Sequence, residues 1–180
     1  MPTAAQYEQM IGRLRHPGLV RLWGQIQAKN TPGWDPGKAL EYLILRAFQI
    51  DGATVKWPYQ VTSGRGTIEQ IDGVVYADSI TSIFECKNLK GALDYDAIAI
   101  LHHQLQRRPP GVIGCCFSTS GFTLPALDLT IRGRQEIALW DNDDIDYALR
   151  GRKMRKALVA KYRYCVEHTM PDLNLRTARI

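Results

Sequence analysis

The sequence predicts an α/β fold in which helices flank a mixed central sheet, with additional helices at both ends of the chain. Three observations predict it. Apolar residues recur at helical spacing as far as residue 50, and a hairpin signal joins two strand-like segments within residues 53–77. From residue 80 onward, short apolar segments alternate with helical ones, which is typical of a sheet covered by helices.

The N-terminal part is expected to be helical. Residues 1–30 have the pattern of two amphipathic helices, broken at His16-Pro17-Gly18. Residues 30–37 are rich in proline and glycine and are predicted to be a loop. We therefore expect a helical extension over residues 1–36, followed by a helix over residues 37–50 with a wide apolar face.

Strands and helices then follow in order. Segments 53–61 and 69–77 are predicted strands joined by a connection over residues 62–67, and 80–86 is a third strand. A helix over 95–108, a buried strand over 112–117, a helix over 123–132 and a strand over 136–140 come next. Asp141 or Asn142 is expected to cap another helix. A basic helix over about 150–168 completes a main domain of residues 37–168, and residues 169–180 are predicted to be a loose tail.

Composition narrows the class of protein. With 180 residues, 45% hydrophobic and 23% charged, the chain is expected to form one soluble domain with its own core. No apolar run is long enough for a membrane helix, and the N-terminus does not have the pattern of a secretory signal. The cysteines form no CxxC pair, so we expect buried free thiols in a cytoplasmic protein and no zinc site. They are Cys86, Cys115, Cys116 and Cys165.

One group of polar residues stands out from these apolar strands. Asp72 lies within a predicted strand, and Glu85-Cys86-Lys87 ends the next one. Glu85 and Lys87 are two residues apart, so both side chains point to the same face of the strand. Neighbouring strands are about 5 Å apart, so Asp72 can lie beside Glu85.

These residue types suit metal-dependent hydrolysis of a phosphodiester. Two carboxylates and a main-chain carbonyl, here from Asp72, Glu85 and Cys86, are oxygen ligands of the kind that Mg²⁺ prefers, and Mn²⁺ is expected to substitute. Mg²⁺ stabilises charge on a phosphoryl group and lowers the pKa of a bound water. Lys87 is expected to position that water or to contact a phosphate oxygen.

The pattern Asp72…Glu85-Cys86-Lys87 resembles the core of the PD-(D/E)xK nuclease superfamily. Glu41 matches a glutamate that many members carry on the preceding helix, and Gln104 matches a glutamine on the following helix. The segment that runs through residues 111–123 into Ser120-Gly121-Phe122-Thr123 is similar to Mrr-type restriction endonuclease domains. The resemblance covers about residues 37–140, with Ile71 where many members have proline and Cys86 where an aliphatic residue is usual. The long N-terminal DNA-binding domain typical of full-length Mrr proteins is not found in this sequence.

The resemblance implies a restriction-endonuclease-like α-β-β-β-α-β core and a Mg²⁺-dependent endonuclease that cuts DNA. It implies that Asp72, Glu85 and the Cys86 carbonyl bind the metal, that Lys87 positions the attacking water and that Glu41 assists. Gln104 joins this candidate catalytic set. A homodimer is expected, because one such site cuts one strand. The setting that the resemblance implies is bacterial or phage defence, or DNA processing.

Basic residues are the candidates for DNA contact. The net charge is +5, and residues 149–165 contain no acidic residue. The side chains that we expect to contact the DNA backbone or a groove are Arg65, Lys90, Arg107, Arg108, Arg152, Lys153 and Lys156.

Other functions are still open at this point. The chain could be a structure-specific nuclease such as a Holliday-junction resolvase, which would prefer branched DNA. It could also be a non-catalytic DNA-binding module with the same fold. A small-molecule enzyme with a nucleotide cofactor has no motif to support it, because the sequence contains no P-loop, GxGxxG or GxSxG pattern.

Overall fold

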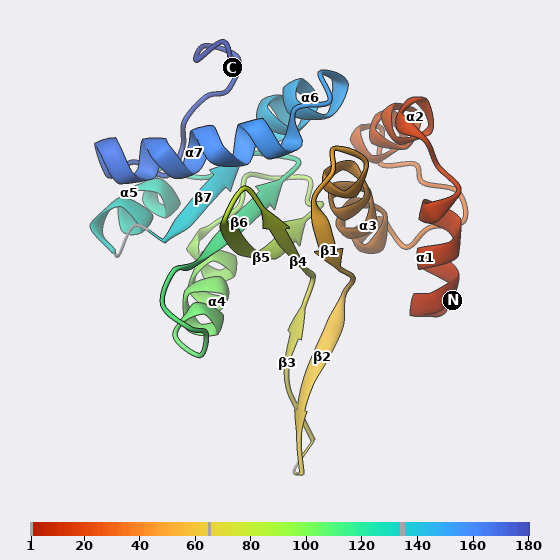
Figure 1. The fold of residues 1–180 in the computed structure, drawn as a ribbon, viewed down its shortest axis with the longest axis horizontal. Helices are drawn as coiled ribbons and strands as arrows, with labels where there is room; N and C mark the ends of the chain where they lie inside the picture. The colour runs from red at the N-terminus through yellow and green to blue at the C-terminus, as the bar shows by residue number, and fades with distance from the viewer. Residues whose placement is uncertain (1, 65, 134–135) are drawn as a thin grey trace.

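A computed structural model describes residues 2–64, 66–133 and 136–180 (Figure 1). Its elements, in chain order, are α1 (Ala4–Gly12), α2 (His16–Gln27), α3 (Pro36–Ile50), β1 (Thr54–Lys56), β2 (Tyr59–Ser63), β3 (Gly66–Ile71), β4 (Gly73–Ala77), β5 (Ile80–Lys87), α4 (Tyr95–Leu105), β6 (Val112–Ser118), α5 (Leu124–Arg132), β7 (Ile137–Trp140), α6 (Asn142–Arg150) and α7 (Met154–His168).

The central sheet has five strands in the order β1-β4-β5-β6-β7. The pairs β1–β4 and β4–β5 are antiparallel, whereas β5–β6 and β6–β7 are parallel. Helices cover both faces, with α4 on one side of the sheet and α7 on the other (Figure 1). Two apolar clusters fill the space between sheet and helices, one beneath α3, α6 and α7 and one beneath α4 and α5. The predicted mixed sheet flanked by helices is therefore confirmed.

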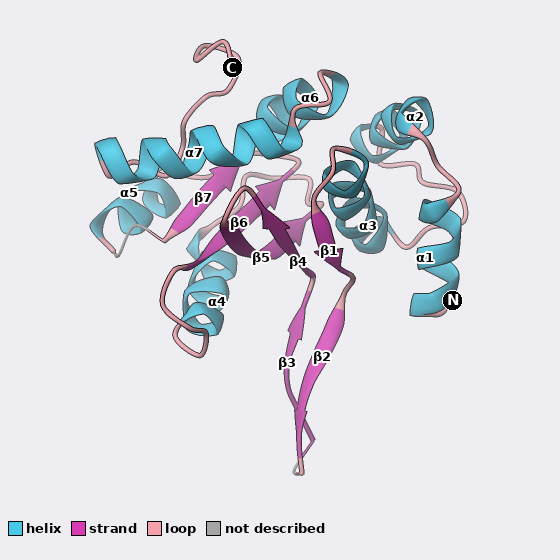
Figure 2. Ribbon diagram, viewed as in Figure 1, coloured by secondary structure: helices cyan, strands magenta, loops and turns pink. Residues whose placement is uncertain are grey.

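Two predicted strands are each broken in two, and this correction matters for the site. The predicted strand 53–61 divides into β1 and β2 at Trp57-Pro58, where proline has no main-chain N–H to donate to a ladder. The predicted strand 69–77 divides into β3 and β4 at Asp72. β2 and β3 pair only with each other and project from the central sheet as a two-stranded arm (Figure 2).

The predicted bounds of several helices also need correction. The break between α1 and α2 falls before His16, because His16-Pro17 forms the first turn of α2, where proline is tolerated. Helix α4 ends at Leu105 rather than residue 108. Helix α7 begins at Met154 rather than near 150, because the chain turns at Arg152, whose φ is +51°. Asp141 caps α6 through a hydrogen bond from the Asp144 N–H, as expected.

The expectation of a loose tail after residue 169 is wrong. Leu175 is fully buried, and its N–H donates to Asp144 at 2.8 Å. The Lys161 ammonium, which is also fully buried, donates to the Leu173 carbonyl and forms an ion pair with Asp144 at 2.7 Å. These contacts attach the C-terminal segment to α6 and α7.

The four cysteines are free and buried, as predicted. Among the described residues, we find no helix with the length and apolar character needed to cross a membrane.

Candidate active site

Asp72 and Glu85 lie across from each other where β4 begins and β5 ends. The strand register pairs Gly73 with Phe84, and Asp72 and Glu85 are each one residue beyond that pair. Asp72 Oδ2 accepts a hydrogen bond of 2.9 Å from the Cys86 N–H. Both carboxyl groups are buried, at 9% and 6% exposure, so the antiparallel register brings two carboxylates together inside the protein.

Lys87 completes the predicted group of two acids and a lysine. It follows Glu85 by two residues on β5, so the two side chains share a face, and they form an ion pair. The Lys87 side chain is 34% exposed, so its ammonium group is accessible from outside. Glu85 therefore holds Lys87 at the C-terminal end of β5, and the parallel strands β6 and β7 end on the same edge of the sheet.

Glu41 is buried on α3, not on a solvated helix face, and the charge of Asp72 acts on it. Its carboxylate accepts a 2.6 Å hydrogen bond from the Lys38 ammonium one helical turn earlier. Lys38 was not among the residues predicted for the site. The signal that could have found it is its spacing of three residues before Glu41, which places the two side chains on the same helix surface.

Close packing of α3 on the sheet explains why Glu41 reaches the site. Gly73 directly follows Asp72, and a Cβ at Gly73 would lie 2.6 Å from Leu45 Cδ2. Leu45 follows Glu41 by four residues and so lies on the same side of α3. The missing side chain at Gly73 lets the helix approach β4, which brings Glu41 towards Asp72.

Burial perturbs all three carboxyl groups in the same direction. The pKa of Glu41 is raised to about 7, first by burial and then by the charge of Asp72, although the contact with Lys38 lowers it. Burial raises the pKa of Asp72 against the effect of the Cys86 N–H, and burial with the charge of Asp72 raises the pKa of Glu85. Burial alone would lower the pKa of Lys87, but its contact with Glu85 raises the pKa above the ordinary lysine value.

The residues of this site fit a magnesium ion. Asp72, Glu85 and the Cys86 carbonyl supply the oxygen donors. Burial raises the pKa of the Cys86 thiol well above its ordinary value, so the thiol is protonated in the metal-free protein. Within ranges 2–64, 66–133 and 136–180, no group of three or more His, Cys, Asp or Glu side chains could hold a metal, so the set depends on the main-chain carbonyl. When all groups are ionised, the carboxylates of Glu41, Asp72 and Glu85 exceed the ammonium groups of Lys38 and Lys87 by one negative charge. This net charge favours a bound cation.

Gln104 is buried at 4% exposure rather than lying on a helix surface. Its side-chain amide donates a 3.0 Å hydrogen bond to the main-chain oxygen of Gln70, two residues before Asp72. Among the described residues, Gln104 Oε1 is buried without a hydrogen-bond partner. The structure thus places Gln104 against the strand that leads into Asp72.

Arg107 and Arg108 are paired with an acidic residue of the arm. Arg107 lies 2.9 Å and Arg108 lies 3.1 Å from the Glu69 carboxylate on β3. Burial would lower the pKa of Arg108, but its contact with the Glu69 carboxylate raises it above the ordinary arginine value. These arginines join α4 to the base of the arm, a role that the sequence analysis did not predict because Glu69 is distant in the chain.

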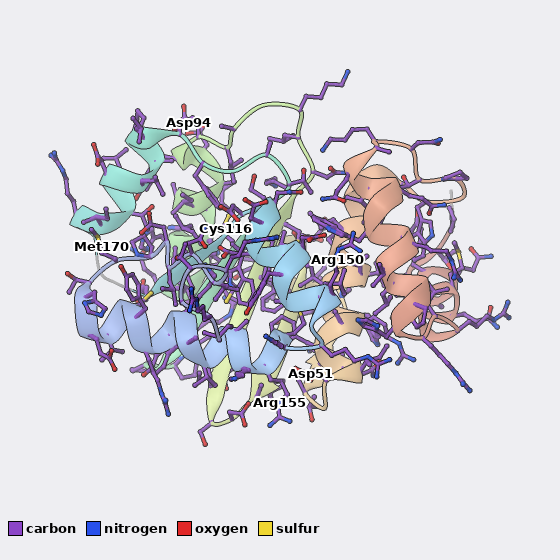
Figure 3. The ribbon with its side chains drawn as sticks, turned by 90° about the horizontal axis from the view of Figure 1, so that it is seen from above. Asp51, Asp94, Cys116, Arg150, Arg155 and Met170 are labelled. Carbon is purple, nitrogen blue, oxygen red and sulfur yellow. The ribbon has the colours of Figure 1, made fainter. Side chains whose placement is uncertain are left out.

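The basic residues of α7 lie far from the carboxylates. Arg155 forms an ion pair of 2.6 Å with Asp78 in the turn between β4 and β5, and it lies beside Asp51 (Figure 3). That turn is at the start of β5, whereas Glu85 is five residues further along, a separation of about 17 Å at the usual strand rise. The predicted DNA-contacting residues in this region are Arg152, Lys153 and Lys156. Any DNA contact that they make is separate from the carboxylate site.

Two other predicted DNA-contacting residues remain. Lys90 is exposed in the loop that follows β5. Arg65 lies outside the described residues.

Comparison with known proteins adds weak structural likenesses. No family model and no curated protein matches the sequence. The protein of unknown function AF1548 is 16% identical with a TM-score of 0.43, and the similarity covers 67% of this chain and 58% of the AF1548 chain. The DNA modification-dependent restriction endonuclease AspBHI is 15% identical with a TM-score of 0.49, over 89% of this chain and 41% of its own. The MspJI restriction endonuclease, solved with a 27-mer oligonucleotide, is 15% identical with a TM-score of 0.40, over 97% of this chain and 40% of its own.

The chain thus spans between about two fifths and three fifths of the lengths of these three proteins. Likenesses with TM-scores below 0.5 are too weak to assign a function.

Proposed function

We propose that the protein is a Mg²⁺-dependent endonuclease that hydrolyses phosphodiester bonds of DNA. The observation that supports this proposal best is the convergence of Asp72, Glu85 and Lys87 at the end of β5, with the Cys86 carbonyl between them in sequence. The resemblance of these residues to the PD-(D/E)xK nucleases supports DNA as the substrate.

Each residue has a distinct chemical role in this proposal. Asp72, Glu85 and the Cys86 carbonyl would hold the Mg²⁺ ion, which when bound stabilises negative charge on the phosphoryl group and acidifies a water. The Cys86 N–H donates to Asp72 Oδ2, and Lys87 contacts Glu85 Oε1, so these contacts fix the two carboxylates that would hold the metal.

Lys87 is the residue that we expect to orient the nucleophile. Its ammonium group donates hydrogen bonds to a water or to a phosphate oxygen, and Glu85 fixes its position. Because the contact with Glu85 raises the pKa of Lys87, the side chain is cationic at neutral pH and acts as a donor rather than as a base. Glu41 assists from α3 by adding negative charge beside Asp72.

The arm gives a duplex a place beside the carboxylates. β3 ends one residue before Asp72, and β2 and β3 project away from the sheet from that point (Figure 2). A two-stranded ribbon of this kind fits the major groove of B-DNA, which is about 12 Å wide. A bound duplex that held the arm in its groove would therefore pass next to Asp72.

The proposal is tested by incubating the protein with supercoiled plasmid, linear duplex and a four-way junction, each with Mg²⁺, Mn²⁺ or EDTA. We expect metal-dependent cutting by the wild type and a loss of at least about a hundredfold in Asp72→Asn, as is typical when electrostatic stabilisation of a transition state is removed. Preference for the junction would indicate a structure-specific nuclease.

Salt-sensitive binding of all three DNAs without cutting under any condition would contradict the proposal and indicate a binding module. The predicted homodimer is tested on the same sample by sedimentation, with and without DNA.

A further inference from the structure

The arm formed by β2 and β3 has two faces, and its strand register assigns each residue to one of them. Side chains alternate between the faces along a strand, and directly opposed residues share a face. The face turned towards α4 carries Tyr59, Val61, Glu69 and Ile71. The opposite face, which we call the amide face, carries Gln60, Thr62, Thr67 and Gln70.

The face turned towards α4 is fixed to the body of the protein. Ile71 is fully buried in the apolar cluster beneath α4, and Val61 packs against that cluster. The Glu69 side chain is 7% exposed and is held by Arg107 and Arg108, which follow α4. This face is therefore not available to a partner, and the charge of Glu69 is neutralised.

The amide face is open and carries no charge. All four of its side chains are exposed, and they are amides and hydroxyls, which both donate and accept hydrogen bonds. Thr67 Oγ1 donates a 3.3 Å hydrogen bond to Gln60 Oε1, which orients the Gln60 amide. Affinity for the phosphate backbone comes from lysine and arginine, whereas sequence is read by donors and acceptors that face the base edges. A neutral face of this kind therefore favours bases over phosphates.

The amide face opens on the same side of the arm as the acidic residues. Gln60 and Gln70 line a cleft of about 410 Å³, and Lys38 lines it too. The Lys38 ammonium is 2.6 Å from Glu41, so the cleft lies beside the acidic residues. Gln70 precedes Asp72 by two residues, which is about 7 Å at the usual strand rise. Successive base pairs are about 3.4 Å apart, so the base pairs beside Gln70 are roughly two or three steps from a phosphate held at Asp72.

We propose that the amide face reads base edges in the major groove of duplex DNA, and that Gln60 and Gln70 select adenine close to the cut. A glutamine side chain binds adenine through two hydrogen bonds, one accepted from N6 and one donated to N7. Opposed side chains of an antiparallel pair have Cβ atoms about 5 Å apart, so the two amides reach neighbouring base pairs. This inference rests on the proposed nuclease function, and it gives that nuclease a sequence preference.

The test measures binding of duplex DNA with randomised base pairs, in EDTA so that no cutting occurs. The duplexes bound by the wild type, Gln60→Ala and Gln70→Ala are recovered and sequenced. Gln25→Ala is the matched control, because Gln25 is an exposed glutamine on α2, a helix that lies away from the arm (Figure 1). Thermal unfolding of each variant checks that it is folded.

We expect the wild type and Gln25→Ala to select adenine at neighbouring base pairs. Gln60→Ala and Gln70→Ala should each lose this selection at one base pair, by about tenfold, as the loss of one two-hydrogen-bond contact predicts. A modified base then tests the contact at one atom, because 7-deazaadenine lacks the N7 acceptor but still pairs with thymine. It should weaken binding by the wild type about fivefold, since one of the two hydrogen bonds is lost, and leave the affinity of the corresponding alanine variant unchanged.

The outcomes separate this inference from the nuclease proposal. If the wild type selects no sequence, or if both arm variants select like Gln25→Ala, the amide face does not read bases, even where the wild type cuts DNA with Mg²⁺. Selection of guanine or cytosine in place of adenine would overturn the assignment of the amides. If the expected losses appear but the wild type never cuts, the amide face stands and the nuclease proposal fails. A wild type that binds no duplex overturns the inference directly.

Discussion

Replacing Glu41 by glutamine is expected to stabilise the metal-free protein near neutral pH. Glu41 is buried beside Asp72, and burial followed by that charge raises its pKa from 4.5 to about 7. Glutamine has nearly the same shape, and its side-chain oxygen can still accept a hydrogen bond from the Lys38 ammonium. The substitution therefore removes the charge and keeps the packing.

The sign follows from the direction of the pKa shift. Between pH 4.5 and about 7 the folded wild type retains a proton on Glu41 that the unfolded chain has lost, so its stability falls as the pH rises. A rise from 4.5 to about 7 corresponds to about 3 kcal/mol. Glu41→Gln avoids this loss, so its advantage should be near zero below pH 4.5 and reach about 3 kcal/mol above pH 7.

The assay is thermal and urea unfolding in EDTA across this pH range. For a domain of this size, 3 kcal/mol corresponds to a difference of roughly 6–12 °C in Tm. Glu167→Gln is the control, because Glu167 is 64% exposed at the end of α7 and should change stability by less than about 0.5 kcal/mol. Parallel pH profiles for Glu41→Gln and the wild type would refute the reasoning about burial and charge.

Three further predictions concern the packing and the ion pairs that hold the fold together outside the carboxylate group. Gly73→Ala should cost about 1–3 kcal/mol by urea unfolding, because the new Cβ would lie 2.6 Å from Leu45. Leu45→Ala should then cost less in the Gly73→Ala chain than in the wild type, and a fully stable Gly73→Ala variant would contradict this packing. Lys161→Met leaves Asp144 buried without its cation and should cost about 3–5 kcal/mol by the same assay, whereas a change below about 1 kcal/mol would argue against the buried ion pair. Glu69→Gln should release two arginines from β3 and speed amide hydrogen exchange in the arm while leaving the central sheet unchanged; equal exchange in both proteins would contradict the anchoring role.

The candidate site was predictable where the evidence is local. Period-two alternation placed Glu85 and Lys87 on one face, and strand spacing placed Asp72 beside Glu85. Asp72 proved to lie one residue before β4 rather than within a continuous strand. Residues 69–77 contain no proline, so nothing local in this segment indicated that the arm leaves the sheet at Asp72.

Contacts between distant segments were not predictable. The charges of Arg107 and Arg108 were visible in the sequence, but their pairing with Glu69 depends on how α4 packs against β3. The C-terminal segment has no periodic apolar pattern, so nothing indicated that Leu175 would be buried by α6 and α7. These interactions come from tertiary packing, which overrides local sequence signals.

The central claim is that the carboxylates and the lysine at the end of β5 form one metal-dependent site for cutting DNA. The most direct test is the rate of plasmid nicking by the wild type, Glu85→Gln and Lys87→Ala over a series of Mg²⁺ concentrations, with DNA binding measured in parallel. The account predicts Mg²⁺-dependent nicking by the wild type, and a loss of at least about a hundredfold in both variants while DNA binding is retained. Nicking that persists at the wild-type rate in either variant, or that is unchanged in EDTA, would contradict it.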